Sequence, residues 1–411
     1  MHILLVHQSF AAINEPGGTR HHELARYLAE GGHTVTVIAS PVSYLTGETR
    51  NRRVPWVTRE DGGLGVTVLR AYTYPGLHRS FVHRVISFLS FMVSSFIIGL
   101  RVKNVDLVWG TSPPIFQGLT AWGHSRIKRV PFLFEVRDLW PAFAIAVGVL
   151  RQPILIGASQ WLEAFLYRHA DQVMVNSPGF IDHVQSRGAK KIALVPNSAD
   201  TAMFDPHATG EEFRHAHDLG SRGTNGTFLA LYAGAHGLSN DLGVVLQAAG
   251  QLRDHPQIKF VLLGDGKEKT ALIERAREIG LENVRFISPL PKTQMPAALA
   301  AADACIAILK PIPLYATVYP NKVFDYMAAG RPVVLAIDGV IREVVETARA
   351  GIFVPPGDPG ELARAVQTLS EQPSLCSEMG MNGRLYVETH FDRPVIAGKL
   401  TGLMEDLVNK V

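Results

Sequence analysis

Short runs of aliphatic and β-branched residues recur along the whole chain, and most lead into a loop rich in glycine or polar residues. Such runs of four to eight residues are typical of buried strands, whereas apolar positions spaced by three and four predict amphipathic helices. The two patterns alternate, which predicts parallel sheets covered by helices. The predicted strands are 3–6, 34–39, 105–109, 131–136, 173–175, 192–195, 228–233, 259–263, 284–287, 305–308, 333–337 and 352–354.

Helical patterns separate these strands, and the whole alternation runs twice. The predicted helices are 21–31, 158–170, 181–188, 242–252, 298–303, 341–350, 358–370, 373–384 and 394–410. Proline and asparagine gather at 196–200, where Asn197 and Asp200 suit turns, so this stretch predicts a connection between domains. We therefore predict an α/β protein in which two doubly wound, Rossmann-like domains, 1–196 and 197–385, face a central cleft. A last segment, 386–411, forms a terminal helix.

One segment does not fit a simple soluble helix. The 16 residues that begin at Val85 and end at Leu100 carry no charge, and basic residues such as Arg79 and Arg101 flank them. The run is too short to span a bilayer comfortably, which takes about 20 residues. It predicts either a helix that lies in the membrane interface or a helix buried against the first sheet, and both alternatives stay open.

Composition narrows the class of protein. The chain has 411 residues, 47% of them hydrophobic and 19% charged, which is typical of a globular protein with two or three domains. A net charge of +3 argues against wholesale nucleic-acid binding. Cys305 and Cys376 are too few for a disulfide framework or a metal cluster. The N-terminal run has no signal-peptide pattern, so we expect a cytoplasmic protein.

The most informative stretch is 319–335, which predicts a loop, a short helix and a buried strand. Asn321 and Lys322 stand at the helix start, where free N–H groups and the helix dipole favour an anion such as a diphosphate. Asp325 lies one turn later on the same face and could accept hydrogen bonds from ribose hydroxyls. Asn321 could instead cap the helix. The alternative is an ordinary surface helix with an exposed Lys–Asp pair.

Glycine loops follow several predicted strands, at the edge where open α/β sheets bind ligands. Gly17 and Gly18 would allow a substrate to approach the backbone, although a plain tight turn explains them equally well. The first loop lacks the Gly-x-Gly-x-x-Gly spacing, which excludes a dinucleotide site of that type. His236, after Gly234, predicts either a ligand contact or a loop histidine bonded to backbone, and the second alternative is favoured.

The strand at 131–136 ends in Arg137-Asp138-Leu139-Trp140-Pro141. Charged residues that leave the carboxyl end of a buried strand are better placed for a site than for core packing. Asp138 could orient a hydroxyl group, and Arg137 could neutralise a phosphate. A salt bridge between strand ends is the alternative for both residues.

The stretch 319–335 resembles the donor-site helix of the retaining glycosyltransferases of family GT4, which have the GT-B fold. Its Pro-Asn-Lys-Val-Phe-Asp-Tyr form, together with Asp-Leu-Trp-Pro at 138–141, is similar to the polysaccharide-assembly branch typified by the L-fucosamine transferase WbuB. Many GT4 members have two glutamates eight positions apart where this chain has Thr317 and Asp325. It also has Ala235 where an arginine is usual, and Arg137 where many members place a histidine.

The resemblance covers the whole chain and implies roles for both domains. It implies that 1–196 binds the acceptor, that 197–385 binds the nucleotide sugar, and that the terminal helix in 386–411 crosses back to the N-terminal domain. The implied catalytic residues are Lys322, Asp138 and Arg137. The implied acceptor-binding residues are Gly17, Gly18 and Arg20, and the donor-binding residues are Gly234, His236, Gly264, Asp265, Gly266, Ile287, Asn321, Lys322 and Asp325.

The implied function is transfer of a sugar, with retention of configuration, from a UDP-linked donor to a lipid-linked or oligosaccharide acceptor in cell-surface polysaccharide assembly. No Asp-x-Asp motif or histidine cluster with ligand spacing occurs, so we expect neither a metal nor another cofactor. The protein would work in the cytoplasm or on the inner face of the cell membrane. Two alternatives remain, namely a nucleotide-sugar epimerase of GT-B fold and a non-catalytic nucleotide-sugar-binding partner of a membrane assembly complex.

Overall fold

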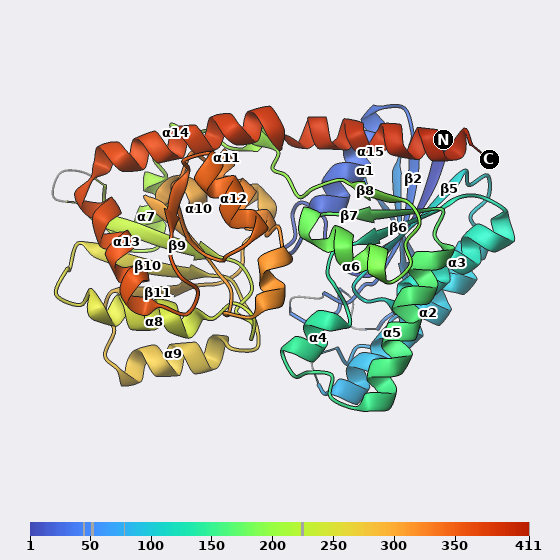
Figure 1. Cartoon of the computed structure of the whole chain (residues 1–411), viewed down its shortest axis with the longest axis horizontal. Coiled ribbons are helices and arrows are strands. Elements are labelled where there is room, and N and C mark those ends of the chain that lie inside the picture. Colours follow the sequence, from blue (N-terminus) through green and yellow to red (C-terminus); the bar gives the residue numbers. More distant parts are fainter. Residues whose placement is uncertain (44–45, 51–52, 78, 223–225, 411) are drawn as a thin grey trace. The chain divides into compact units, whose positions relative to one another are not determined.

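A computed structural model describes residues 1–43, 46–50, 53–77, 79–222 and 226–410 (Figure 1). The chain divides into two compact units. The first unit comprises Met1–Ile13, Gly17–Pro196 and Pro394–Val411, and the second comprises Asn14–Pro16 and Asn197–Arg393. Each unit is a twisted sheet between helices, so the predicted class, two doubly wound α/β units, is confirmed.

The first unit contains an eight-stranded sheet with the order β3-β4-β2-β1-β5-β6-β7-β8. All neighbours pair in parallel except β3 and β4, which are antiparallel. The strands are β1 (His2–Val6), β2 (Thr34–Ala39), β3 (Val57–Asp61), β4 (Val66–Ala71), β5 (Leu107–Ser112), β6 (Phe132–Val136), β7 (Gln172–Val175) and β8 (Ile192–Leu194). The sequence analysis predicted neither β3 nor β4. The first of them is an edge strand of mostly polar, solvent-facing residues, which gives no apolar pattern.

The helices of the first unit cover both faces of this sheet. They are α1 (Arg20–Glu30), α2 (Phe81–Leu100), α3 (Phe116–Lys128), α4 (Ala142–Ala146), α5 (Pro153–His169), α6 (Ile181–Ser186) and the terminal α15 (Arg393–Val408). The C-terminal helix α15 packs into the core of this unit, where Ile396, Leu400 and Met404 join the cluster that contains Ile3 and Leu5 of β1.

The segment from Val85 to Leu100 lies within α2, and neither of its two predicted alternatives describes it alone. One face of the helix is buried against the rest of the unit, through residues such as Phe91 and Ile98. The opposite face is exposed along its whole length, through residues such as Val93.

The second unit contains a six-stranded parallel sheet with the order β11-β10-β9-β12-β13-β14. The strands are β9 (Phe228–Ala233), β10 (Ile258–Leu263), β11 (Val284–Ile287), β12 (Ala304–Ile308), β13 (Val333–Ala336) and β14 (Gly351–Phe353). The helices are α7 (Glu211–Ala216), α8 (Leu242–Gln251), α9 (Lys269–Glu278), α10 (Met295–Ala301), α11 (Asn321–Ala328), α12 (Val340–Thr347), α13 (Pro359–Glu371) and α14 (Pro373–His390).

Both faces of this second sheet are buried. Leu229 and Leu231 of β9 enter one apolar cluster, whereas Ala230 and Tyr232 enter the cluster on the opposite face. Because neither face meets water, the strands are apolar at every position rather than at alternate positions. This is why the sequence predicts β9 with its observed bounds.

Strand order reverses once in each sheet, between β1 and β5 in the first and between β9 and β12 in the second. Loops that leave the carboxyl ends of neighbouring strands diverge at such a reversal, and open α/β sheets bind ligands there. The loop after β9 begins at Gly234, so the second reversal point lies at one of the glycine loops predicted to bind the donor.

Candidate active site

Lys322 lies over the end of β9 in the second unit. A side chain at Gly234 would place its Cβ 2.5 Å from Nζ of Lys322, and Nζ lies 3.9 Å from the centre of the Tyr232 ring. Nζ is buried and has no hydrogen-bond partner among the described residues. Burial lowers the pKa of Lys322 to about 7. A buried ammonium group with unused donors favours an anion, which is what the sequence predicts at this position.

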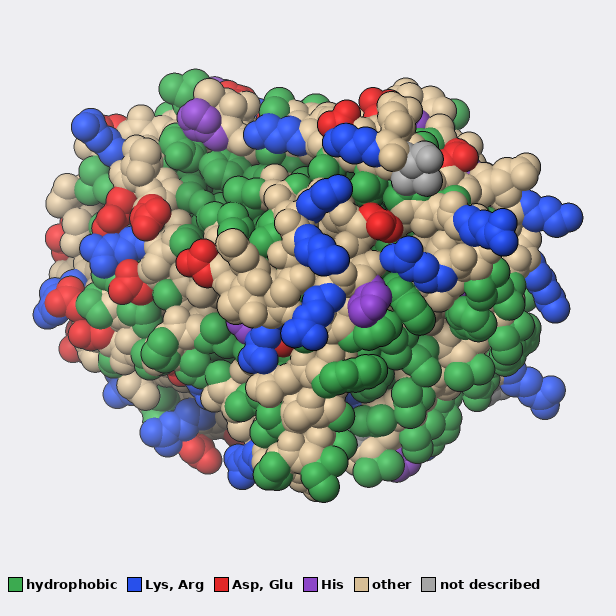
Figure 2. Space-filling model, turned by 45° about the vertical axis from the view of Figure 1, so that its right-hand side comes forward, with side chains coloured by type: hydrophobic (Ala, Val, Ile, Leu, Met, Phe, Trp, Pro, Cys, Tyr) green, Lys and Arg blue, Asp and Glu red, His purple; other side chains and the backbone are tan. Residues whose placement is uncertain are grey.

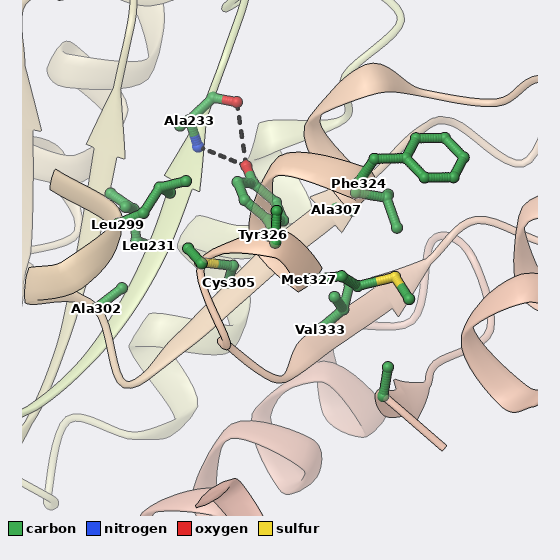
Figure 3. Packing of buried hydrophobic residues seen from close by; sticks show 14 of the residues in the cluster. Leu231, Ala233, Leu299, Ala302, Cys305, Ala307, Phe324, Tyr326, Met327 and Val333 are labelled. Carbon is green, nitrogen blue, oxygen red and sulfur yellow. Dashed lines mark hydrogen bonds between the residues drawn. The ribbon is translucent and has the colours of Figure 1, made fainter. Parts of the chain in front are cut away.

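Tyr326 fixes the helix that carries Lys322. Its hydroxyl accepts a hydrogen bond from the backbone N–H of Ala233 at 2.9 Å and donates one to the carbonyl of the same residue at 3.1 Å (Figure 3). Ala233 is the last residue of β9, and Tyr326 follows Lys322 by four residues, so both side chains share one helix face. The tyrosine therefore holds α11 against the strand end. No pattern in the sequence indicates this role of Tyr326.

The start of α11 differs from the prediction. Pro320 occupies the N-cap position with an extended backbone, and no side chain of a described residue caps the helix. Asn321 is the first helical residue, so the prediction that it caps the helix is wrong. Its side-chain amide instead donates to Oδ2 of Asp325 at 3.4 Å. The N–H of Val323 donates to the carbonyl of Pro320 at 3.1 Å, so the N–H groups of Asn321 and Lys322 are the first-turn donors that suit an anion.

Asp325 pairs with a residue that the sequence analysis did not single out. Its Oδ2 lies 2.6 Å from Nζ of Lys292, and the two side chains are only 17% and 7% exposed. The alternative of an exposed Lys–Asp pair within α11 is therefore wrong. A ribose contact by Asp325 stays a prediction, and the ribose would share a carboxylate that Lys292 already holds.

Three glycines allow the loops after β9 and β10 to meet. Gly234, Gly264 and Gly266 have φ values of 153°, 145° and 155°, which residues with a side chain rarely adopt. A Cβ at Gly264 would overlap the carbonyl oxygen of Gly234. The N–H of His236 donates to the carbonyl of Asp265 at 2.8 Å, which joins the two loops. These backbones can approach one another only because the side chains are missing.

His236 is fully buried between these loops, and neither ring nitrogen has a hydrogen-bond partner among the described residues. The favoured alternative, a histidine whose ring is bonded to backbone, is therefore wrong. Burial is the main cause that lowers the pKa of His236 to about 4; the charges of Lys269 and Lys322 act in the same direction, and Asp265 opposes them. The neutral ring offers one donor and one acceptor to a ligand.

Ile287, the last residue of β11, contributes through its backbone. Its carbonyl accepts a hydrogen bond from the N–H of Gly264 at 3.0 Å. Lys269 lies beside it and donates from Nζ to the carbonyl of Gly264 at 2.7 Å. These bonds hold the loop after β10 in place, and contact between Ile287 and a nucleotide base stays a prediction.

Asp138 follows β6 in the first unit. Its Oδ1 is buried and has no hydrogen-bond partner among the described residues. Burial raises the pKa of Asp138 to about 7, although the charge of Arg137 and the N–H of Leu139 act in the opposite direction. A carboxyl group that is half protonated near neutrality can donate or accept a hydrogen bond, which suits the predicted contact with a hydroxyl.

The three predicted acceptor-binding residues lie at the start of α1 and differ in environment. Gly17 and Gly18 are exposed, and a Cβ at Gly18 would meet open space. Arg20 is 5% exposed, and its guanidinium donates to the carbonyls of Val195 and Pro196 at 2.8 Å. Arg20 thus secures the end of the first unit, which leaves its predicted acceptor contact without geometric support.

Arg20 also belongs to a buried polar network that the sequence did not indicate. Glu135 accepts from Arg20 at 3.2 Å and lies 2.6 Å from Nε2 of His21. Burial alone would raise the pKa of Glu135, but His21 and Arg20 lower it to about 2. The positive charge of Arg20 compensates the negative charge of Glu135 inside the unit. Within the described residues, no group of His, Cys, Asp or Glu is arranged to hold a metal ion.

Both halves of the chain match known glycosyltransferase families. Residues 17–198 match the family described as "Glycosyl transferase 4-like domain", and residues 227–372 match "Glycosyl transferases group 1". The chain is 26% identical over 326 residues to the Escherichia coli (strain K12) protein named as colanic acid biosynthesis glycosyl transferase WcaI. That alignment covers 77% of this chain and 78% of WcaI.

Solved structures share the fold over the full chain. Sucrose-phosphate synthase from Thermosynechococcus elongatus superposes with a TM-score of 0.79 at 18% identity, with 100% of both chains covered. Anabaena Alr3699/HepE, solved in complex with UDP-glucose, gives a TM-score of 0.71 at 18% identity, with 99% of this chain and 100% of that chain covered. The two family matches and this fold together place the chain among the GT4-type glycosyltransferases with the GT-B fold.

Proposed function

We propose that this protein is a retaining glycosyltransferase that moves a sugar from a UDP-linked donor to a lipid-linked sugar acceptor in cell-surface polysaccharide assembly. The observation that carries the proposal is the buried, unpaired ammonium group of Lys322 above the glycine loop after β9. The UDP and UDP-glucose complexes of HepE support the choice of donor, and the colanic acid role in the name of WcaI supports the choice of pathway class.

The chain's own residues supply what the departure of a nucleotide diphosphate requires. As the bond between the sugar and the diphosphate breaks, negative charge develops on the leaving oxygen. Lys322, the N–H groups of Asn321 and Lys322 in the first turn of α11, and the neutral ring of His236 are the donors that would stabilise this charge. The acceptor oxygen bonds to the sugar on the same face, and its proton passes to the departing diphosphate, so no separate base is needed.

We propose that Asp138 and Arg137 act on the acceptor. The Asp138 carboxyl would orient the attacking hydroxyl, and Arg137 would add positive charge. Charge stabilisation by protein donors makes a metal ion unnecessary for the transfer. The protein would meet its acceptor at the cytoplasmic face of the cell membrane.

The chain departs from many relatives at Ala235 and Thr317, and the geometry supports a compensation. Thr317 Oγ1 donates to the carbonyl of Leu314 at 2.7 Å, so this hydroxyl has a role within the loop. Ala235 is exposed and has no charge to offer. We assign the phosphate-binding role of the absent arginine to Lys322, which reaches the same loop from α11.

Thermal stabilisation by UDP, GDP, ADP and their glucose conjugates tests the donor assignment, because a ligand that binds the folded state raises the melting temperature. We expect the largest shift with a uridine diphosphate and none in Lys322→Met. Lys267→Met is the matched control, since Lys267 is an exposed lysine of the neighbouring loop. A shift that survives in Lys322→Met would refute the phosphate assignment.

Transfer is tested with a radiolabelled UDP-sugar and a lipid-linked acceptor, in the presence and absence of EDTA. We expect a product of retained configuration and no effect of EDTA, with transfer in Lys322→Met reduced more than about tenfold. Rearrangement of the donor sugar without transfer would establish the epimerase alternative. Binding of donor without any turnover would establish the non-catalytic alternative.

A further inference from the structure

The helix α2 differs from ordinary amphipathic helices, because its buried face contains polar as well as apolar side chains. Its buried positions include three serines, Ser87, Ser94 and Ser95, each at most 1% exposed. Ser94 donates to the carbonyl of Tyr72 at 2.6 Å, and Ser95 donates to the carbonyl of Met92 at 3.1 Å. The polar side chains therefore face the protein.

Among the side chains of α2 that the structure describes, every exposed one is aliphatic. Its exposed residues recur at spacings of three and four, and each is between 39% and 63% exposed. They are Val82, Ile86, Leu89, Val93, Ile97 and Leu100. At 1.5 Å per residue this stripe is about 27 Å long. A soluble helix normally turns its charged residues to water, so the stripe is an unpartnered apolar surface.

Exposed apolar residues also occur on α5. Ile154 is 86% exposed and Trp161 is 65% exposed. The helix α3 lies between α2 and α5, because Phe116 of α3 contacts Phe88 of α2, and Trp122 of α3 contacts Phe165 of α5. The connections that contain α2, α3 and α5 all run in the same direction across the sheet, so these helices cover one of its faces.

Apolar side chains gather over this region in the lower right part of Figure 2. We call the exposed apolar residues of α2 and α5 together the docking face.

Basic residues surround the docking face. Residues 79–170 contain ten arginines and lysines and four acidic residues. Two of the acidic residues, Glu135 and Glu163, are fully buried, and Asp106 is the one exposed carboxylate in this segment, all of which the structure describes. Arg79 and Arg101 bracket α2, and Arg151 precedes α5. Positive charge at the rim of an apolar surface complements the anionic headgroups of a bilayer.

The geometry points to one occupant, and we infer that the docking face lies in the interface of a bilayer that contains anionic phospholipid. Trp161 lies at the level of the headgroups, and the aliphatic stripe of α2 contacts the acyl chains. A second copy of the chain fits less well, since pairing through this face would oppose two basic rims.

The docking face does not imply that α2 crosses the membrane. Among the described residues, Val82–Leu100 is the one helix long and apolar enough to do so by length and composition. However, α2 connects β4 to β5, which belong to the same sheet, and its serine face is packed inside the unit. A spanning orientation would pull those strands apart and leave backbone and hydroxyl groups in hydrocarbon. The helix therefore lies in the plane of the interface.

The inference rests on the proposed function only in that a lipid-linked acceptor requires a membrane surface, and the docking face contains no residue of the candidate active site. The test is cosedimentation of the full chain with vesicles of phosphatidylcholine, with and without phosphatidylglycerol. We expect binding to the mixed vesicles at least about tenfold tighter than to phosphatidylcholine alone, because headgroup charge and apolar insertion act together.

Two triple variants distinguish this face from exposed apolar residues in general. The test variant is Ile86→Gln, Val93→Gln and Ile154→Gln, and the control variant is Leu64→Gln, Met381→Gln and Leu385→Gln. All six side chains are exposed, so both proteins are expected to fold. We expect the test variant to lose at least about tenfold in vesicle affinity and the control to change by less than about twofold.

Thermal stabilisation by UDP-glucose is measured on the same samples, because it reports the donor site independently of the membrane. Quenching of Trp161 fluorescence by brominated lipids, absent in Trp161→Phe, would locate α5 in the interface. Equal vesicle binding by both triple variants, or no vesicle binding by the native chain, would overturn the inference. Loss of a dimer in the test variant, without any vesicle binding, would show that a second copy occupies the face.

Discussion

Binding of UDP-glucose is expected to weaken as the pH rises through neutrality, because the binding site contains a lysine that loses its proton in this range. Burial lowers the pKa of Lys322 to about 7. In the free protein about 90% of this side chain is charged at pH 6, and about 3% at pH 8.5. If the diphosphate binds the charged form, the affinity falls about thirtyfold between these values.

Isothermal titration calorimetry measures this dependence directly. UDP-glucose suits the assay because its diphosphate is a diester and keeps a constant charge from about pH 6 to pH 8.5. Since the bound diphosphate restores the charge of Lys322, we expect uptake of close to one proton on binding at about pH 8 and of almost none at about pH 6. The dependence of the binding enthalpy on the buffer's ionisation enthalpy gives the number of protons taken up on binding.

Three variants separate Lys322 from other titrating groups. Lys322→Met should bind weakly at every pH without the slope, whereas Lys267→Met should keep it. Asp138 also has a pKa of about 7, so Asp138→Asn should keep the slope if Lys322 causes it. An affinity that is constant over this pH range, or a slope that persists in Lys322→Met, would refute the reasoning.

The same pKa makes a prediction about stability. Lys322 holds its proton to a higher pH in the unfolded chain than in the folded protein, so unfolding takes up a proton between about pH 7 and pH 10.5. Stability from this group therefore rises with pH across that window. At 1.36 kcal/mol per pH unit the upper bound is about 5 kcal/mol, and movement of the flexible side chain toward water reduces it. We expect Lys322→Met to stabilise the ligand-free protein by about 1–3 kcal/mol at pH 7.

Three further substitutions test the scaffold. Tyr326→Phe removes the hydroxyl that satisfies both backbone groups of Ala233, so urea unfolding should show a loss of about 1–3 kcal/mol, accompanied by weaker UDP-glucose binding. Glu135→Gln leaves Arg20 buried without its carboxylate and should cost about 3–5 kcal/mol at pH 7. In the native protein the stabilisation by Glu135 is present above about pH 4.5 and lost as the pH falls toward about 2, so the variant should show a weaker loss of stability in acid. Gly264→Ala forces two loop backbones apart, and its thermal shift with UDP should disappear even where circular dichroism shows a folded protein.

Local sequence patterns were sufficient to predict the α/β architecture and most of its strands. Continuous apolar strands such as 228–233 can be predicted because both faces of the sheet are buried. The glycine loops indicate where the chain turns at the ends of strands. The loop, helix and strand in 319–335 can likewise be predicted from the prolines and glycine that bound the helix. The edge strand β3 was not predicted, because its residues are mostly polar and exposed to solvent and so form no apolar pattern.

Which of these residues contact one another depends on the tertiary structure. No spacing in the sequence shows that Lys292 pairs with Asp325, that Tyr326 bonds to Ala233, or that Lys322 stands unpaired over Gly234. The same holds for α2, whose uncharged sequence leaves open which face is buried. Packing buries three serines together with Phe91 and Ile98, and it leaves six other aliphatic side chains exposed. Local patterns set secondary structure because they act within one element, whereas partners and exposed faces depend on contacts between residues far apart in the chain.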